Sequence, residues 1–346
     1  MTQRLISFIS FLFIQLFISS LTILAEDGKD NLPQVTIPRA DEWSREQVVL
    51  EAGPEGSWDA RLYGQISPCT VVKKNGTWFL YYVGADGDRT TDGGPANRAL
   101  GVATSTDGIH YKKFEGNPVL THQPQNNQEE GVFSAGSILD HNGDILLYFG
   151  ATLASNPTTE SVQCNAGLAA SKDGFHFENQ GYVFYWNNPN VWGHGDEISP
   201  IGAYRNGDNI NVYYIAKSGK VSWGLGVASG ESPSGFSRFS KVQDEQRDII
   251  GGCDPIRISN DSIALFVVKD FNANTIEVLT AHVAHPEKLT DPVREYPMFR
   301  PNYRHTTVYL DRERKMWFMY QSSDQPDNGN KIIVRTAPMK LVDTKK

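Results

Sequence analysis

The sequence has little cysteine and no cluster of basic residues. Its three cysteines, Cys69, Cys164 and Cys253, form neither a CxxC pair nor a metal-ligand spacing, so we predict no disulfide framework. Cys69 and Cys253 fall within expected strands, which favours buried free thiols. The formal net charge is -8 at pH 7. Since no run of Lys and Arg is available to neutralise phosphates, the composition argues against a nucleic-acid partner.

Long apolar runs are confined to the first 25 residues. After Arg4 the chain reads LISFISFLFIQLFISSLTILA, which predicts a secretory signal sequence cleaved after Ala25. The alternative is a retained membrane anchor, since about 20 apolar residues can span a bilayer. We expect residues 1–25 to be the signal and residues 26–346 to be one domain. The mature protein would be a secreted or periplasmic monomer.

What the sequence does contain is a fivefold repeat. Each copy has a short apolar strand, a polar turn and a second strand rich in aromatic and branched residues, the pattern of a β-hairpin. The copies are ISPCTVVKKNGTWFLYYVG from Ile66, FSAGSILDHNGDILLYFGA from Phe133, ISPIGAYRNGDNINVYYIA from Ile198, CDPIRISNDSIALFVVKD from Cys253 and RHTTVYLDRERKMWFMYQS from Arg304. Aligned on Pro68, Ala135, Pro200, Pro255 and Thr306, they lie 67, 65, 55 and 51 residues apart. This spacing predicts an all-β fold, a five-bladed β-propeller with one four-stranded blade per repeat.

The repeats also predict how the ring closes. In the first copy two further strands follow the hairpin, expected at Ala99–Ser105 and Ile109–Phe114, with an Asp107-Gly108 turn between them. The fifth copy ends after three strands, near residues 335–338. The segment from Trp43 parallels the fourth strand of the first copy. We therefore expect the N-terminal strand to complete the last blade and to close the ring without a covalent link.

The segments that enter the first strand of each blade should open onto one face, where long loops on a rigid scaffold commonly carry function. They bring carboxylates to the channel mouth from four blades, with aromatic and basic residues beside them. The set is Trp58, Asp59, Arg61, Glu129, Glu130, Trp192, His194, Asp196, Glu197, Asp254, Arg304 and His305. A charged group in an enclosed site loses solvation, so it normally has a partner or a task. Pairing with a neighbour is the structural alternative for each carboxylate, and packing between blades is that for each tryptophan.

Carboxylates from different blades of a funnel can support glycoside cleavage. One carboxylic acid protonates the leaving oxygen, and one carboxylate acts as nucleophile or activates water. Trp58 and Trp192 would stack on sugar faces. The remaining basic residues would bind hydroxyls, water or a uronic carboxylate; they are Arg61, His194, Arg304 and His305.

At this point the chain resembles the five-bladed propeller glycosidases, the superfamily that holds glycoside hydrolase families 32, 43, 62 and 68. GSWDARLYGQISPCTVVKKNGTWFLYYVG followed by RALGVATSTDGIHYKKFEGNPVL is similar to the first blade of many exported members, and RHTTVYLDRERKMWFMYQS resembles the last blade of family 43. In that blade a histidine at the position of His305 faces the axis, often near a bound calcium. The resemblance covers nearly all of the mature chain and implies a glycosidase that requires no cofactor, with calcium at His305 as the alternative.

The active-site pattern departs from that of the families it resembles. They carry an aspartate just before the proline-like position of blades one and two, and a glutamate before that of blade three. Here the first two positions hold Ser67 and Ser134, and Glu197 lies close to the third. Serine cannot replace a carboxylate base, so either the base has moved to Asp59 or Glu130, or catalysis is absent.

We therefore expect a glycoside hydrolase that acts on polysaccharide-derived oligosaccharides, with Glu197 as general acid and Asp59 or Glu130 as base or nucleophile. Asp254 and Asp196 would orient the sugar or stabilise positive charge at the anomeric carbon. A non-catalytic carbohydrate-binding propeller is the main alternative. A lyase, a phosphorylase and a protein-interaction role are the others.

Overall fold

The structure is a computed structural model that describes most residues from Leu32 to Asp343. The described ranges are 32–60, 66–85, 98–121, 129–140, 142–153, 164–195, 197–218, 221–242, 249–252, 254–269, 275–297, 306–323 and 330–343. The chain divides into two compact units, residues 1–32 and 33–346. The first unit lies outside the described residues except for Leu32, so the signal sequence and its cleavage stay predictions. Within the described ranges, no helix has the length and apolar character needed to cross a bilayer.

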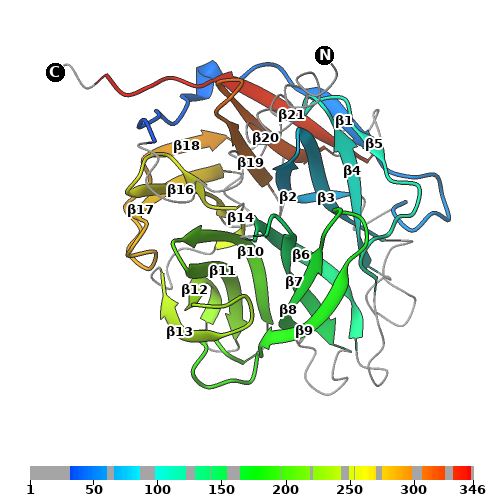
Figure 1. Ribbon diagram of the computed structural model, residues 1–346, viewed down its shortest axis with the longest axis vertical. Helices are drawn as coiled ribbons and strands as arrows, with labels where there is room; N and C mark the ends of the chain where they lie inside the picture. The colour runs from blue at the N-terminus through cyan, green and yellow to red at the C-terminus, as the bar shows by residue number, and fades with distance from the viewer. Residues whose placement is uncertain are drawn as a thin grey trace, which may run out of the picture. The chain divides into compact units, whose positions relative to one another are not determined.

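Residues 33–346 form a ring of five blades, which confirms the predicted β-propeller (Figure 1). Blade 1 contains β2 (Ser67–Lys74), β3 (Thr77–Ala85), β4 (Arg98–Ser105) and β5 (Lys112–Lys113). Blade 2 contains β6 (Glu129–Leu139), β7 (Ile145–Leu153), β8 (Cys164–Ser171) and β9 (Glu178–Phe184). Blade 3 contains β10 (Glu197–Asn206), β11 (Asn209–Ser218), β12 (Val221–Gly230) and β13 (Phe236–Lys241). Each of these three blades is an antiparallel meander, and one parallel bridge between Arg98 and Gly131 joins blades 1 and 2.

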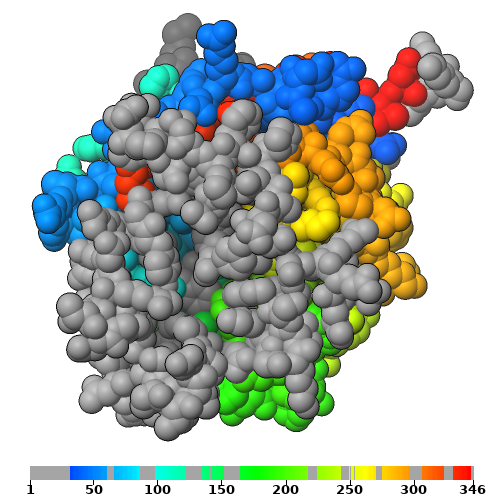
Figure 2. Space-filling model, turned by 180° about the vertical axis from the view of Figure 1, so that it is seen from behind, coloured from blue at the N-terminus to red at the C-terminus, as the bar shows by residue number. Residues whose placement is uncertain are grey.

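The last two blades depart from a plain meander of four strands. Blade 4 contains β14 (Ile249–Gly252), β15 (Ile256–Arg257), β16 (Ser262–Lys269), β17 (Thr275–His282) and β18 (Arg294–Pro297). Blade 5 contains β19 (Thr306–Asp311), β20 (Met316–Ser323), β21 (Lys331–Pro338) and, from the other end of the chain, β1 (Gln47–Glu51). β1 follows a short 3-10 helix, Ala40–Glu42, and pairs antiparallel with β21. The space-filling view shows N-terminal residues, in blue, beside C-terminal residues, in red (Figure 2). The predicted closure of the ring by the N-terminal strand is confirmed.

The core consists of five apolar clusters, one at each interface between neighbouring blades. The middle strand β3 shows why, because successive side chains of a strand point to opposite faces. Phe79, Tyr81 and Val83 face blade 2, whereas Trp78, Leu80 and Tyr82 face blade 5. A strand covered on both faces needs apolar residues at every position, which explains the continuous runs in the repeats. Cys69 lies in one of these clusters as a buried free thiol, as predicted, and Cys164 is also buried.

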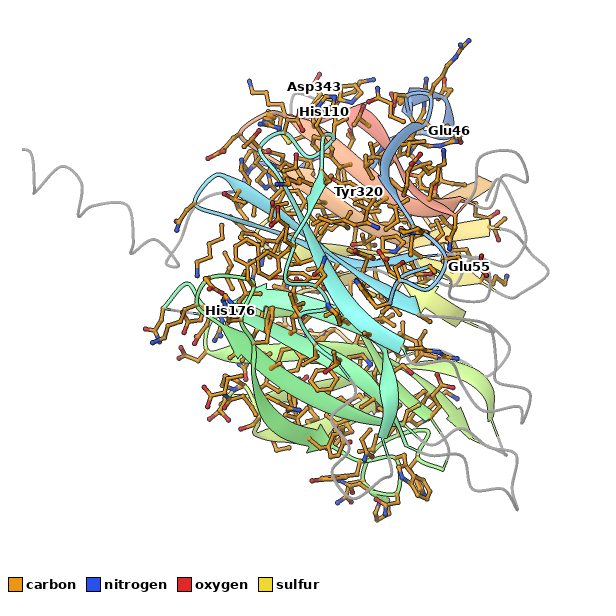
Figure 3. The ribbon with its side chains drawn as sticks, turned by 90° about the vertical axis from the view of Figure 1, so that its right-hand side faces the viewer. Glu46, Glu55, His110, His176, Tyr320 and Asp343 are labelled. Atoms are coloured by element: carbon orange, nitrogen blue, oxygen red, sulfur yellow. The ribbon has the colours of Figure 1, made fainter. Side chains whose placement is uncertain are left out.

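The Asp-Gly turns have a structural role. The carboxylate of Asp107 accepts hydrogen bonds from the backbone N–H groups of Ile109 and His110, both at 2.8 Å, and lies 2.6 Å from Nδ1 of His110. Burial alone would raise the pKa of Asp107, but these hydrogen bonds outweigh it and hold the pKa below its usual range. A second turn, at His176 on blade 2, repeats the geometry (Figure 3). Gly108 has a φ of +75°, as such a turn requires.

One predicted strand is shorter than expected. The fourth strand of blade 1 was expected at Ile109–Phe114, but β5 spans only Lys112–Lys113. The reason is that the backbone N–H groups of Ile109 and His110 donate to Asp107 and are not available for pairing with β4.

Closure of the ring predicts unequal effects for two neighbouring residues of β1. Leu50 is 5% exposed and packs with Phe318 and Tyr320, whereas Val48 is 49% exposed. Leu50→Ala should lower the free energy of unfolding by about 2–4 kcal/mol, because it removes buried apolar contacts at the closing interface. Val48→Ala should change it by less than about 0.5 kcal/mol. Urea denaturation of both variants measures this, and equal losses would contradict a stabilising role for the closing strand.

Candidate active site

The inner strands of the blades lie around the central axis of the ring, and two of them come into backbone contact. A Cβ atom added to Gly136 on β6 would lie 2.4 Å from the Cα atom of Gly202 on β10. Glycine at position 136 is therefore required where β6 and β10 meet. Because Gly136 and Gly202 lie side by side, positions along β6 and β10 can be compared by counting residues from these two glycines.

Glu197 is the first residue of β10, at the end where the chain enters blade 3. Its side chain is half-buried, and the hydroxyl of Ser199 donates a hydrogen bond to its Oε1 at 2.9 Å. Ser199 lies two residues further on the same strand face and is 2% exposed. The carboxyl group of Glu197 is thus oriented by a buried neighbour while it keeps access to solvent.

Glu130 lies near the start of β6, which begins at Glu129. It is six residues before Gly136, and Glu197 is five residues before Gly202. Since β6 and β10 are neighbouring inner strands, the backbones of Glu130 and Glu197 lie at similar positions along the central axis of the ring. The side chain of Glu130 lies outside what the structure describes.

The carboxylate of Asp254 joins blade 4 to three other blades. Its Oδ1 accepts hydrogen bonds from the backbone N–H groups of Ser137 at 3.0 Å and Ala203 at 3.1 Å, and its Oδ2 accepts one from the hydroxyl of Thr70. These partners are on β6, β10 and β2, and Thr70 also lies 2.5 Å from the hydroxyl of Ser137. Asp254 therefore holds the inner strands together at the hub. Asp254 is partly exposed as a residue, but its carboxyl group is buried. Burial raises the pKa of this carboxyl group to about 7, although the hydrogen bonds that it accepts act to lower it.

An irregularity in the inner strand of blade 4 accompanies this arrangement. Gly252 pairs with Val267, and Ile256 pairs with Ala264. Three residues separate the first pair from the second on the inner strand, but only two on β16. The extra residue is a bulge between Gly252 and Ile256, a stretch that includes Asp254 and Pro255. Proline cannot donate to the hydrogen-bond ladder, and bulges commonly re-aim a side chain.

Ser67 and Ser134 occupy the positions at which the families that the sequence resembles carry aspartates, and both serines are buried. Ser134 is 2% exposed, and its hydroxyl has no hydrogen-bond partner within the described structure. Ser67 is 9% exposed and lies 3.4 Å from the hydroxyl of Ser322. Thr70 and Ser137 come three residues after Ser67 and Ser134, so the Asp254 carboxylate makes its contacts about 10 Å further along the inner strands than these serines.

Asp59 lies away from the inner strands of the hub. It is 2% exposed, its Oδ2 accepts hydrogen bonds from Lys113 Nζ at 2.6 Å and Tyr82 OH at 3.1 Å, and Ser57 donates to its Oδ1 at 3.1 Å. Lys113 is on the outermost strand of blade 1 and Tyr82 is on its second strand. The structure places Asp59 in a buried ion pair, which is the structural alternative considered for each carboxylate.

Asp59→Asn should therefore lower the free energy of unfolding and have little effect on the rate of hydrolysis. We expect a loss of about 1–3 kcal/mol in the free energy of unfolding, because Lys113 and Tyr82 would keep their positions without the charge they pair with. Thermal denaturation followed by circular dichroism measures the loss. Full stability combined with an abolished hydrolytic rate would instead assign Asp59 to the catalytic machinery.

Both tryptophans of the candidate site pack on their own blades. The Trp58 ring lies 5.5 Å from that of Tyr82, and a Cβ atom at Gly101 would lie 2.4 Å from it. Trp192 covers Gly224 in the same way, and Tyr214 OH donates to its backbone oxygen at 3.1 Å. Each tryptophan thus anchors the segment that enters its blade while staying half-exposed.

His194 follows in a tight turn between Gly193 and Gly195. Gly193 has a φ of +75° and Gly195 a φ of +146°, which a residue with a side chain rarely adopts. The His194 side chain is exposed, and its backbone N–H donates to Val191 O at 3.2 Å. The turn places an imidazole three residues before Glu197.

Four further candidates, Arg61, Asp196, Arg304 and His305, lie outside the described residues, as does Cys253. Within the described ranges, no group of His, Cys, Asp and Glu is arranged to hold a metal ion. Sequence reasoning missed Thr70 and Ser137 as partners of Asp254. Their common signal is a hydroxyl two residues after the aligned Pro68 and Ala135 in two neighbouring repeats.

Comparison of the sequence with known proteins finds similarity to sucrose-6-phosphate hydrolases. The chain is 34% identical to that of Escherichia coli over 157 residues, which are 42% of this chain and 31% of that protein. It is 29% identical to that of Zymomonas mobilis over 118 residues, 31% of this chain and 22% of that protein. The chain thus spans less than a third of the length of the curated relatives it matches. No protein-family model matches the sequence.

Solved structures with a similar fold include two glycoside hydrolases. A family 117 glycoside hydrolase from Zobellia galactanivorans aligns with a TM-score of 0.60 and 15% identity over 92% of this chain and 94% of its own. A family 32 β-fructofuranosidase from Bombyx mori aligns with a TM-score of 0.60 and 12% identity over 86% of this chain and 65% of its own. The TM-scores establish a shared fold, and the predicted resemblance to the five-bladed propeller glycosidases is confirmed.

Proposed function

We propose that this protein is a glycoside hydrolase that cleaves glycosidic bonds of oligosaccharides at the end of the channel where β6 and β10 begin. The observation that carries the proposal is Glu197, a half-buried carboxylate at the start of an inner strand whose orientation Ser199 fixes. The sequence similarity to sucrose-6-phosphate hydrolases and the propeller fold support the same class of reaction.

In this proposal Glu197 is the general acid. It gives its proton to the glycosidic oxygen as the bond to the anomeric carbon breaks, and a second carboxylate either attacks that carbon or removes a proton from the attacking water. Glu130 is the better of the two predicted partners, because its backbone is level with Glu197 on the neighbouring inner strand. Asp59 is paired with Lys113 away from the hub, so we do not assign it as the base.

The remaining candidates would bind the sugar. His194 is exposed three residues before Glu197 and would bind hydroxyls, together with Arg61, Asp196, Arg304 and His305. The unpartnered hydroxyl of Ser134 is a further group for a substrate hydroxyl or a water molecule. The reaction needs no cofactor. We also propose that the protein is exported and cleaved after Ala25, which N-terminal sequencing of the mature protein would test.

The test is a panel of fructo-, arabino-, xylo- and galacto-oligosaccharides incubated with the purified protein. Fructosides come first, because the curated relatives are sucrose-6-phosphate hydrolases and one similar structure, with a TM-score of 0.56, is of a β-fructofuranosidase in complex with sucrose. Release of shorter sugars from one class supports hydrolysis. Binding of a sugar without any product would favour the non-catalytic carbohydrate-binding alternative.

A further inference from the structure

A polar pocket lies at the end of blade 3 that is opposite to Glu197. Its volume is about 320 Å³, and it is lined by residues of blades 3 and 4. Asn206, at one side of it, is the last residue of β10, and Glu197 is the first. Ten residues of extended strand separate the two ends by about 30 Å, so one sugar unit cannot contact both.

Hydrogen bonds between the two blades hold the pocket in shape. Arg257 Nη2 donates to Asn206 Oδ1 at 2.9 Å, and Asn206 Nδ2 donates to the backbone oxygen of Val283 at 3.4 Å. Tyr204 OH donates to the same oxygen of Val283 at 2.8 Å. The walls are therefore preformed, which lowers the entropic cost of binding a ligand.

The chemistry of the lining is that of amides, hydroxyls and one pair of opposite charges. Asn211 is 3% exposed, and the hydroxyl of Ser229 donates to its Oδ1 at 2.7 Å, which fixes the orientation of its amide. Arg238 and Glu231 are both exposed at the pocket. Among the described residues, the lining of the pocket includes no aromatic ring on which a base could stack and no second cation that would favour phosphate. Planar amide, guanidinium and carboxylate groups are instead suited to paired hydrogen bonds with neighbouring hydroxyls.

We propose that this pocket is a second carbohydrate-binding site, which holds one unit of an uncharged sugar chain. Its volume is at the lower end of the range for small-molecule sites, about 300–1,000 Å³, and suits a short ligand. The lining contains one positive and one negative side chain, Arg238 and Glu231, so it favours neither an anionic nor a cationic ligand. The site does not depend on hydrolysis at Glu197, and a propeller with two separated sites would hold a long glycan while its end is processed.

The test uses the full chain with Glu197→Gln, so that no sugar is consumed, and the same oligosaccharide panel as the probe. Backbone amide NMR spectra recorded during the titration should show shifts at Ser229 and Gly230, which line the pocket. Arg238→Ala should weaken the binding reported by these two residues at least tenfold. Arg294→Ala, which removes an exposed arginine outside the pocket, should leave it unchanged.

Two results would overturn the proposal: no shift at Ser229 and Gly230 with any sugar of the panel, or equal affinity with and without Arg238. Arg238→Ala in the chain with intact Glu197 should also hydrolyse short substrates at the unaltered rate. If the unaltered protein hydrolyses no sugar of the panel, the proposed hydrolysis is wrong. The shifts at Ser229 and Gly230 still show in that case whether the pocket binds a sugar.

Discussion

Glu197→Gln should lower the rate of oligosaccharide hydrolysis by about 10²–10⁴-fold, the usual contribution of a positioned general acid. Glutamine has nearly the same shape as glutamate and can still accept the hydrogen bond that Ser199 donates to Oε1. It has no ionisable proton to give to the leaving oxygen. Initial rates with saturating substrate measure the loss, and the substrate should still bind, because the change removes a proton donor and leaves the channel otherwise intact.

The dependence on the leaving group separates an acid from a merely structural residue. The control substrate is a 4-nitrophenyl glycoside of the sugar that the protein accepts. Its leaving group is 4-nitrophenolate, a stable anion that needs little protonation as the bond breaks. Glu197→Gln should therefore be much less impaired on this substrate than on an oligosaccharide. Ser199→Ala keeps the carboxyl group but removes its hydrogen-bond donor. It should reduce the rate on the oligosaccharide by a smaller factor than Glu197→Gln does, and it should leave the rate on the 4-nitrophenyl glycoside nearly unchanged. Equal losses on both substrates for Glu197→Gln would contradict its role as acid.

Asp254→Ala should destabilise the whole propeller, with a loss of about 3–9 kcal/mol in the free energy of unfolding. The carboxylate accepts hydrogen bonds from the N–H groups of Ser137 and Ala203 and from the hydroxyl of Thr70. Alanine would leave these buried donors without an acceptor, at about 1–3 kcal/mol each. Because the donors belong to three blades, we expect one cooperative transition shifted to lower denaturant concentration. A loss below about 1 kcal/mol would contradict the linking role of Asp254.

Asp254→Asn should keep these hydrogen bonds. It should remove the part of the pH dependence of the free energy of unfolding that comes from the Asp254 carboxyl group. The amide oxygen can accept from Ser137 and Ala203, and the amide nitrogen can donate to Thr70 if the Thr70 hydroxyl donates to Ser137, 2.5 Å away. Burial raises the pKa of Asp254 from its ordinary value near 4 to about 7. The folded protein therefore binds a proton that the unfolded chain has released. The stabilisation of the folded state that comes from this bound proton is fully present below a pH of about 4 and is lost as the pH rises through about 7.

The free energy of unfolding of the unaltered protein, relative to Asp254→Asn, should thus fall between about pH 4 and pH 7, by as much as about 4 kcal/mol. Above pH 7 the asparagine variant should be at least as stable as the unaltered protein. Burial raises the pKa of the nearby Cys69 thiol to about 12, so Cys69 does not titrate in this range. Urea denaturation at pH 5 and pH 8 measures the difference, and parallel pH profiles would show that Asp254 stays ionised in the folded state.

The fold could be predicted from the sequence because each blade repeats one pattern with both faces buried. The fivefold alignment placed the inner strands, and the missing fourth strand of the last copy pointed to β1. The length of β5 could not be predicted from the apolar pattern alone. It depends on hydrogen bonds to one carboxylate, that of Asp107.

The site was harder to predict, because the repeat shows where the chain enters a blade but not where a side chain ends. Asp59 and Glu197 both precede an inner strand, yet Asp59 reaches Lys113 on the outer edge of blade 1, whereas Glu197 begins β10 itself. Asp254 occupies the position of Ser67 and Ser134 in its repeat, and a bulge accompanies its contacts with three other blades. Such contacts depend on tertiary geometry that no spacing within one repeat contains.

The central claim is that the carboxylate at the start of β10 makes this propeller a hydrolase. The most direct test is the release of shorter sugars from the oligosaccharide panel by the unaltered protein and by Glu197→Gln, measured side by side by chromatography. We expect the unaltered protein to release product from one sugar class and Glu197→Gln to release at least 100-fold less, since that is the smaller contribution of a general acid. Equal release by both proteins, or binding without release by the unaltered protein, would contradict the claim.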